Sequence, residues 1–312
     1  MNIPVFDFHC DTPVFLAKGA SLAENNLHFD LKRASKFAGY AQCFACYTTT
    51  LDDKDPTLTL ERGLAGINRE LEKNKSIIRQ AYTAEDILQN QEAGLMSAVL
   101  TLEGSAGYGF DPELLGVLYD AGVRIASLGW NEKNPLAGSH ITGGGLTDLG
   151  KAFVNEAQRL GILIDVSHIS DEAFWDIMDI TQAPIIATHS NSRALCDHSR
   201  NISDEMFSAI CKTGGIVGIN MCADFLGENP TLDTACEHVK HFLDLDPTGK
   251  HIALGSDLDG CEDLPLDFKG VENYPDFAEC MLENGIGIDT IKNIYWNNAI
   301  EVMKNAVHNN KK

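Results

Sequence analysis

Short apolar runs recur along the whole chain, and amphipathic stretches separate them. Eight runs are predicted as strands because they are rich in Val, Ile, Leu and Phe and end at polar residues or glycine. These runs cover residues 3–9, 40–47, 96–103, 123–130, 162–168, 184–189, 215–220 and 251–257. They are almost continuously apolar rather than alternating, which is typical of parallel strands that are covered on both faces.

The stretches between these strands have the spacing of amphipathic helices, and several begin with Ser, Thr or Asp, which cap helix N-termini. They cover residues 55–74, 111–121, 147–160, 170–181, 203–212 and 232–243, and a last helix is expected at 289–305. Eight strand–helix units in 312 residues fit a closed (β/α)8 TIM barrel of the α/β class better than an open doubly wound sheet, which stays the alternative. No linker marks a second domain, so one domain is predicted over 1–312.

Composition narrows the classes of partner. The net charge of −21 argues against nucleic acid and anionic membranes, because binding phosphates needs clustered Lys and Arg.

Met1 lies two residues before the first predicted strand, which leaves no room for a signal peptide, and no apolar run reaches about 18 residues. Nine cysteines without a secretory context are expected to be reduced thiols, with Cys43 and Cys46 on opposite faces of a core strand. We therefore expect a soluble, cytoplasmic protein.

Polar side chains gather where the predicted strands end. His9 and Asp11 follow the first strand, Glu103 ends the third, His168 ends the fifth and His189 ends the sixth. In a barrel, the C-terminal ends of all strands meet at the face where such enzymes carry their chemistry. One histidine after an apolar run is usually a core or loop residue, but five such side chains at equivalent positions predict a metal site.

The ligand types narrow the metal. Imidazole and carboxylate without a nearby thiolate suit Zn²⁺, and also Mn²⁺, Co²⁺ or Fe²⁺. Five ligands are more than a tetrahedral ion with a bound water can use, so two ions are expected. Glu103 is the natural bridge, because a carboxylate can bind two ions and a neutral imidazole cannot. His9 and Asp11 would then hold one ion, and His168 and His189 would hold the other. Two ions about 3.5 to 4 Å apart lower the pKa of a water that they share.

Six segments, in order from the first strand to the last, carry a resemblance to a known family. They are Asp7-Phe8-His9-Cys10-Asp11, Leu102-Glu103-Gly104, the strand 161–168 that ends Asp165-Val166-Ser167-His168, the strand 183–190 that ends Thr188-His189-Ser190, Arg200-Asn201, and Gly255-Ser256-Asp257-Leu258-Asp259-Gly260. As a set they resemble the membrane (renal) dipeptidase family of amidohydrolase-type barrels.

The resemblance implies a zinc dipeptidase with the same five metal ligands. It further implies that Asp257 takes the proton from the attacking water and passes it to the leaving amine, and that Arg200 pairs with the C-terminal carboxylate of a small peptide substrate. Members commonly tolerate a D-residue on the C-terminal side of the cut bond, and they commonly form homodimers, so both properties are expectations for this chain.

The chain departs from the family pattern at the fourth strand. Mammalian members end this strand with a histidine that helps to hold the substrate carbonyl or the tetrahedral intermediate, whereas Trp130 stands at that position here. Trp130 or Asn131 can donate a hydrogen bond in its place, or the contact is lost in this chain. Both interpretations stay open from the sequence.

Two other functions also stay open. One is another amidohydrolase-type C–N hydrolase, such as a cyclic amidase or a deaminase, many of which carry His-x-His on strand one and a carbamylated lysine on strand four. The other is a catalytically silent metal-binding barrel. The presence of Asp257 beside the five expected ligands argues against a silent barrel, because a purely structural metal site needs no additional base.

Overall fold

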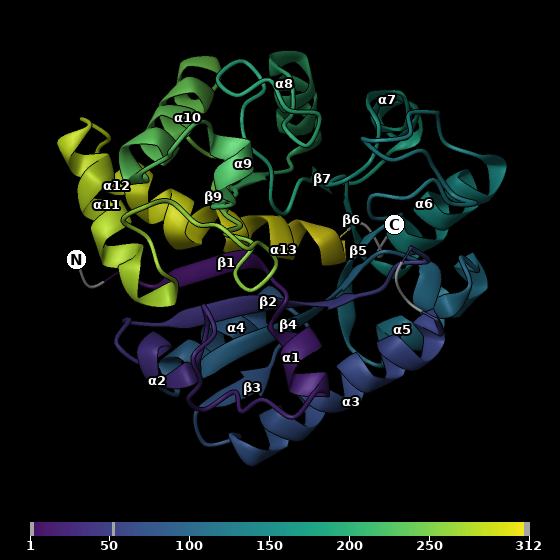
Figure 1. Ribbon diagram of the computed structural model, residues 1–312, viewed down its shortest axis with the longest axis horizontal. Coiled ribbons are helices and arrows are strands. Elements are labelled where there is room, and N and C mark those ends of the chain that lie inside the picture. The colour runs from purple at the N-terminus through teal and green to yellow at the C-terminus, as the bar shows by residue number, and fades with distance from the viewer. Residues whose placement is uncertain (1–2, 52–53, 309–312) are drawn as a thin grey trace.

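A computed structural model, which describes residues 3–51 and 54–308, shows a parallel sheet that curls into a nearly closed barrel with helices around it (Figure 1). The strands follow one another around the barrel in the order β7-β6-β5-β4-β2-β1-β9-β8. Their bounds are β1 Val5–Cys10, β2 Tyr40–Tyr47, β4 Met96–Glu103, β5 Val123–Ser127, β6 Leu163–Asp165, β7 Ile185–Ile186, β8 Val217–Ile219 and β9 Ile252–Leu254. All eight predicted strands and the α/β barrel class are confirmed.

The barrel closes between β7 and β8 through a single parallel bridge, Ala187 to Val217. Ala187 N donates to Ile216 O at 3.0 Å, and Gly218 N donates to Ala187 O at 2.8 Å. A further strand, β3 (Ile78–Gln80), pairs with β4 outside the ring. The sequence did not reveal it, because a strand of three residues with one buried side chain leaves no periodic pattern.

The predicted helices are all present. The α-helices of the described chain are α1 Thr12–Ala17, α2 Leu31–Ala34, α3 Pro56–Lys73, α4 Ala84–Glu92, α5 Leu115–Asp120, α6 Asp148–Leu160, α7 Asp171–Ile180, α8 Asp204–Thr213, α9 Ala223–Leu226, α10 Leu232–Leu245, α11 Tyr274–Glu283, α12 Ile288–Lys292 and α13 Asn298–His308. The expected last helix is continuous from α12 to α13 through a π-helical turn at Asn293–Asn297. Among the described helices, none is long and apolar enough to cross a membrane.

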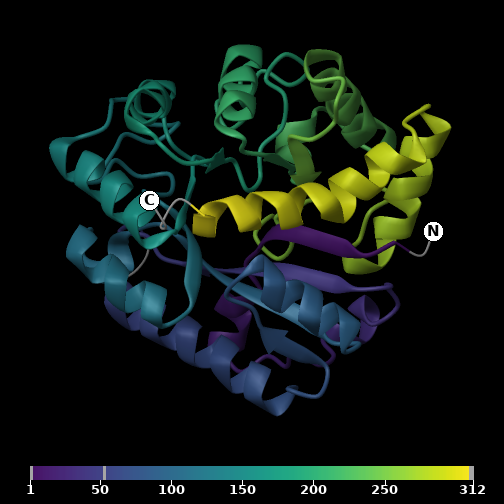
Figure 2. The same ribbon diagram turned by 180° about the vertical axis from the view of Figure 1, so that it is seen from behind.

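The interior of the barrel is a layer of apolar side chains to which every barrel strand or its immediate flank contributes. Its strand members are Phe6, Phe8, Ala41, Cys43, Val99, Ile125, Leu163, Ile186, Ile216 and Ala253. Residues of the C-terminal helix, such as Trp296 and Ile300, join this layer. Asn298 Nδ2 donates to Ile252 O at 2.7 Å, so α13 covers the end where the strands begin (Figure 2). Cys46 belongs to the other core layer, which confirms that Cys43 and Cys46 lie on opposite faces.

Several strands end earlier than their apolar runs predict. The fifth and eighth predicted strands extend to 168 and 257, whereas β6 ends at Asp165 and β9 at Leu254. His168 and Asp257 have φ of 71° and 60°, a left-handed backbone that a strand cannot contain. Non-glycine residues in this region cost of order 1–3 kcal/mol and cluster at functional sites. The chain therefore leaves the sheet at the positions that the sequence singled out for chemistry.

Candidate active site

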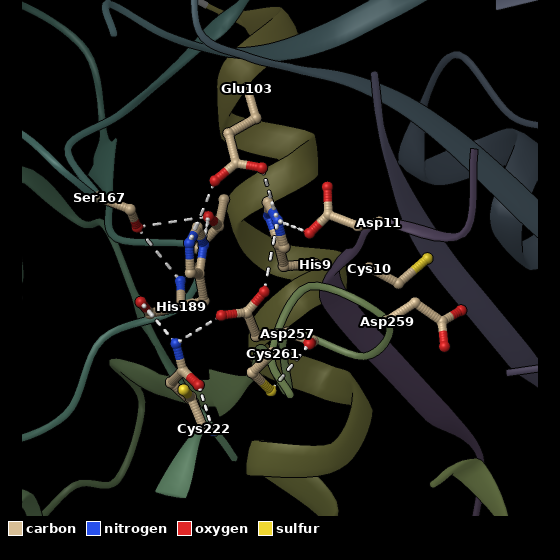
Figure 3. Close-up of polar contacts among 12 residues, drawn as sticks. His9, Cys10, Asp11, Glu103, Ser167, His189, Cys222, Asp257, Asp259 and Cys261 are labelled. Atoms are coloured by element: carbon tan, nitrogen blue, oxygen red, sulfur yellow. Dashed lines mark hydrogen bonds and ion pairs between the residues drawn. The ribbon is translucent and has the colours of Figure 1, made fainter. Parts of the chain in front are cut away.

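Five side chains meet at the C-terminal end of the barrel, and we call them the mouth cluster: His9, Asp11, Glu103, His168 and His189. Figure 3 shows four of them, His9, Asp11, Glu103 and His189, together with Asp257. His9 Nε2 lies 3.4 Å from Asp11 Oδ2 and 3.3 Å from Glu103 Oε2. On the other side, Glu103 Oε1 lies 2.9 Å from His168 Nε2 and 3.6 Å from His189 Nε2. The two oxygens of one carboxylate thus face two separate pairs of ligand atoms.

The cluster contains polar atoms that lack partners. His9 Nε2 and Asp11 Oδ1 are buried and have no hydrogen-bond partner among the described residues. His168 Nε2 and His189 Nε2 point at one another at 3.0 Å. Because buried polar atoms are normally paired, this arrangement fits cations placed between the side chains. The donor set, imidazole and carboxylate, also fits zinc and similar divalent ions.

Burial and charge set the protonation of these groups. Burial lowers the pKa of His168 to about 4 and holds the pKa of His189 well below its usual value. Both rings are therefore neutral near neutral pH, which is the form that binds metal ions. Burial opposes ionisation of Glu103, but His9 and His168 hold the Glu103 pKa well below its usual range. Burial would lower the His9 pKa, but the charges of Glu103 and Asp11 outweigh burial and raise the pKa well above its usual value. The same negative charges attract a metal cation, which would take the place of the proton on His9.

The His189 ring is oriented by a chain of hydrogen bonds. Thr188 Oγ1 donates to Asp165 Oδ2 at 2.7 Å, so it accepts from His189 Nδ1, also at 2.7 Å. Asp165 Oδ1 also accepts from the backbone N–H groups of Ser167 and Thr188. With its proton on Nδ1, His189 directs the lone pair of Nε2 at the cluster, as metal-binding histidines do.

Asn131 and His140 orient the ring of His168. Asn131 Oδ1 lies 2.8 Å from His168 Nδ1 and 2.8 Å from His140 Nε2, and it accepts a hydrogen bond from each. His140 Nδ1 in turn lies 2.8 Å from Ser199 Oγ. Burial and the charge of Arg200 lower the pKa of His140 to about 3, so this ring is neutral. Because Asn131 Oδ1 accepts the proton of His168 Nδ1, the lone pair of His168 lies on Nε2, which faces Glu103.

Asp257 lies beside the His9 side of the cluster. Its Oδ1 is 3.9 Å from His9 Nε2, and its Oδ2 accepts from Asn220 Nδ2 at 3.1 Å. Burial raises the pKa of Asp257. The loop that carries it is anchored by Asp7, whose Oδ2 accepts from Ser256 Oγ at 2.7 Å. The carboxylate therefore has one oxygen held and the other directed toward the cluster.

Arg200 is a buried cation without a carboxylate partner. Only 4% of the residue is exposed, and it forms no ion pair within the described chain. Its Nη2 donates to His189 O at 3.2 Å, whereas its Nε is buried without a partner among the described residues. An unpaired buried guanidinium is costly unless an anion binds to it. This side chain is therefore available for an anionic group of a ligand.

One cavity of about 610 Å³ is lined by Asp11, Glu103, His168, Asp257 and Arg200, and it is large enough for a dipeptide. Trp130 forms part of its wall and packs edge-on against Tyr47 at 5.1 Å between ring centroids. All nine site residues named from the sequence thus lie in or beside one site. Sequence reasoning missed the supporting groups, which are Asp7, His140, Asp165, Thr188 and Asn220. Asp165 and Asn220 lie in predicted strand ends, and that position was the available signal.

Comparison with known proteins identifies the family. The family model described as Membrane dipeptidase (Peptidase family M19) matches residues 1–312. The chain belongs to this family. Membrane dipeptidases of family M19 are metallopeptidases, so the expectation of a hydrolase of this kind is confirmed at the level of the family.

Curated relatives of this M19 chain include an uncharacterized protein of Klebsiella pneumoniae, 32% identical over 267 residues, which are 81% of this chain and 97% of the relative. An uncharacterized dipeptidase of Schizosaccharomyces pombe is 32% identical over 226 residues, 70% of this chain and 54% of that protein. The chain thus spans about half the length of the second relative. A solved metallopeptidase from Rhodobacter sphaeroides, liganded with a phosphinate mimic of L-Ala-D-Ala, has the same fold, with TM-score 0.90, 23% identity and coverage of 98% and 100%.

Proposed function

We propose that this M19 chain is a binuclear zinc dipeptidase that hydrolyses the peptide bond of dipeptides. The observation that supports this most is that three members of the mouth cluster, Asp11, Glu103 and His168, line one cavity of about 610 Å³ together with Asp257 and Arg200. A metal-ligand set, a proton carrier and a partner for a free carboxylate are the parts that dipeptide hydrolysis requires.

The two ions would share Glu103. His9 and Asp11 would hold one ion and His168 and His189 the other, because the two oxygens of Glu103 face these two pairs. When bound, such a pair supplies a water of lowered pKa and an electrophile for the substrate carbonyl. Zinc is proposed from the ligand types, and Mn²⁺, Co²⁺ or Fe²⁺ are the substitutes that the same ligands accept.

Asp257 would manage the proton. Its Oδ2 is held by Asn220 Nδ2, which leaves Oδ1 free to accept a proton from the attacking water and to deliver it to the leaving amine. The left-handed backbone at Asp257 turns the carboxylate out of β9 and toward the cluster. Asn220 therefore fixes the geometry of the proton transfer without taking part in it.

Arg200 would select the substrate. A C-terminal carboxylate at the open Nε of Arg200 neutralises the buried charge, and it places the preceding peptide bond within the cavity. Trp130 would form the wall beside the substrate, and Asn131 would hold His168 in place. The ligand of the Rhodobacter sphaeroides structure mimics L-Ala-D-Ala, and this supports the proposal that a D-residue is accepted on the C-terminal side.

The test is turnover on a panel of L-L and L-D dipeptides by zinc-loaded protein, together with Asp257→Asn. We expect hydrolysis by the unchanged protein and a loss of about 10²- to 10⁴-fold in kcat for Asp257→Asn with its metal content retained. Asp148→Asn removes a fully exposed carboxylate and serves as the matched control. Intact dipeptides with fully loaded protein, or no effect of Asp257→Asn, would exclude the proposal.

The nine cysteines, expected to be reduced thiols, support a cytoplasmic location as a proposal, and the resemblance supports a homodimer. Cell fractionation tests the location, and light scattering of the purified chain tests the oligomeric state. A monomer at all concentrations would exclude the homodimer and leave the catalytic proposal intact, because no residue from a partner is needed to complete the cavity described above.

A further inference from the structure

A second group of metal-ligating side chains lies far from the mouth, at the end where the barrel strands begin. We call it the base cluster: Cys211, Asp246 and His251. Cys211 lies in the last turn of α8, Asp246 caps the C-terminus of α10, and His251 directly precedes β9. The thiol, one carboxylate oxygen and one ring nitrogen all lie within 4.8 Å of one another. In Figure 1, α8 and α10 lie side by side, and His241 Nε2 of α10 lies 2.8 Å from Asp204 Oδ1 of α8.

Asp246 has an oxygen that the fold does not use. Its Oδ1 accepts from Thr248 Oγ1 at 2.6 Å and from Thr248 N at 3.1 Å, which closes the turn after α10. Its Oδ2 is buried and has no hydrogen-bond partner among the described residues. A carboxylate oxygen that is withdrawn from water without a donor is unfavourable, so a cation or proton is needed beside it.

The His251 ring is held by a backbone carbonyl. Its Nδ1 lies 2.7 Å from Gly215 O and therefore donates to it. This contact holds a proton on Nδ1, so that Nε2 is the nitrogen left to bind a cation. Metal-binding histidines are typically fixed in this way by a backbone carbonyl. The C-terminal ends of α8 and α10 also place partial negative charge nearby, which favours a cation.

We propose that Cys211, Asp246 and His251 bind Zn²⁺ or another thiophilic divalent cation, with water as the fourth ligand, at a site independent of the mouth cluster. Ligand atoms in a tetrahedral zinc site lie roughly 3.3 to 3.8 Å apart, as bond lengths of about 2.0 to 2.3 Å require. Atoms within 4.8 Å of one another reach this geometry through side-chain adjustments of about 1 Å. Such an ion would join α8, α10 and β9 at the base of the barrel.

The thiol selects the kind of cation. Burial and the charge of Asp246 raise the pKa of Cys211 to about 12, so binding must displace the thiol proton. Hard ions such as Mg²⁺ and Ca²⁺ prefer oxygen ligands and gain little from sulfur, whereas zinc and cobalt bind thiolate well. The site is therefore assigned to the zinc class of ions.

Cobalt absorption tests the site directly. Metal-free full-length protein is titrated with Co²⁺, and the thiolate-to-cobalt charge-transfer band in the near ultraviolet is recorded. The mouth cluster has only nitrogen and oxygen ligands and gives no such band. We expect one of the bound equivalents of cobalt to produce the band in the unchanged protein at saturation. Cys211→Ser should abolish it, lower the bound metal by one equivalent and retain dipeptide turnover.

Two kinds of variant complete the test. His251→Gln keeps the thiol but removes the ring nitrogen, and it should weaken cobalt binding, followed by the same band, by about tenfold or more. Cys196→Ser and Cys222→Ser remove thiols elsewhere, Cys222 at the catalytic cavity, and should leave the band unchanged. The absence of the band at saturating cobalt, or a full band in Cys211→Ser, would overturn the proposal, whatever the outcome of the dipeptide assay.

Discussion

The mouth and the base of this barrel hold ligand atoms at comparable spacing but in different surroundings. The mouth cluster is buried, three of its members line a cavity of about 610 Å³, and Asp257 and Arg200 line the same cavity. The base cluster is half-buried and does not line that cavity. The ligands alone indicate metal binding at both ends. In our proposal, Asp257 as proton carrier and Arg200 as carboxylate partner distinguish the mouth, as a site for chemistry, from the base, as a site that fastens helices to the sheet.

Metal removal should separate the two ends most strongly. A chelator that strips both clusters should abolish dipeptide hydrolysis, because Asp257 alone cannot activate water, and readdition of zinc should restore it. Cys211→Ser should lose and regain activity in the same manner as the unchanged protein. Metal content by mass spectrometry is measured beside turnover. Full activity in metal-free protein would contradict the assignment of the mouth.

Replacing Arg200 should have the next largest effect. Arg200→Lys removes the Nε donor and the planar fork, and breaking such a buried charged contact costs about 2 to 5 kcal/mol, or about 30-fold to several thousand-fold in kcat/KM. A dipeptide amide, which lacks the C-terminal carboxylate, should be hydrolysed equally slowly by both proteins. Steady-state kinetics are measured for both proteins on the free dipeptide and on its amide, which together form a double-mutant-type cycle. A substrate amide that is cleaved as fast as the free acid would exclude Arg200 as its partner.

Asn131→Ala should have a smaller effect. Without the Oδ1 acceptor, His168 no longer keeps its proton on Nδ1, and loss of such a supporting contact costs about 10- to 100-fold in metal affinity or activity. The metal affinity is measured by competition with a chelator of known strength. Asn297→Ala, at an exposed helical position, is the matched control. An unchanged metal affinity would mean that Asn131 does not orient a ligand.

The base should affect stability rather than catalysis, and by the smallest amount. A bound ion at 100 times its Kd stabilises the folded chain by about 2.7 kcal/mol, which corresponds to roughly 4 °C in Tm for a chain of this length. In zinc-saturated protein, Cys211→Ser should therefore unfold about 4 °C earlier with its kcat unchanged. Differential scanning calorimetry provides the measurement, and an identical Tm would argue against a fastening role.

The strand-end residues could be predicted from the sequence because a barrel places all strand C-termini at one face. His9, Glu103 and His189 needed only that rule and the length of their apolar runs. The contact between Asn131 and His140 could not be predicted, because His140 lies in the irregular segment 128–147. The path of this segment is fixed by tertiary bonds such as His140 N to His168 O at 2.8 Å.

The base cluster was hidden for a related reason. Asp246 and His251 lie close together in the sequence, but Cys211 comes near them only when α8 packs beside α10. Its thiol counts as an ordinary reduced cysteine until that packing is known. The ends of the strands could not be predicted either. The strands β6, β7, β8 and β9 end before their apolar runs do, because the chain leaves the sheet there to turn toward the mouth. Local pattern therefore predicts which elements form, whereas contacts between loops decide which atoms meet.

Anomalous diffraction from crystals of the zinc-loaded protein tests the central assignment most directly. Two peaks should lie at the mouth, about 3.5 to 4 Å apart, one beside His9 and Asp11 and one beside His168 and His189, with Glu103 between them. A weaker or equal third peak is expected beside Cys211. A single peak at the mouth, or none in crystals grown from active protein, would contradict the two-metal centre.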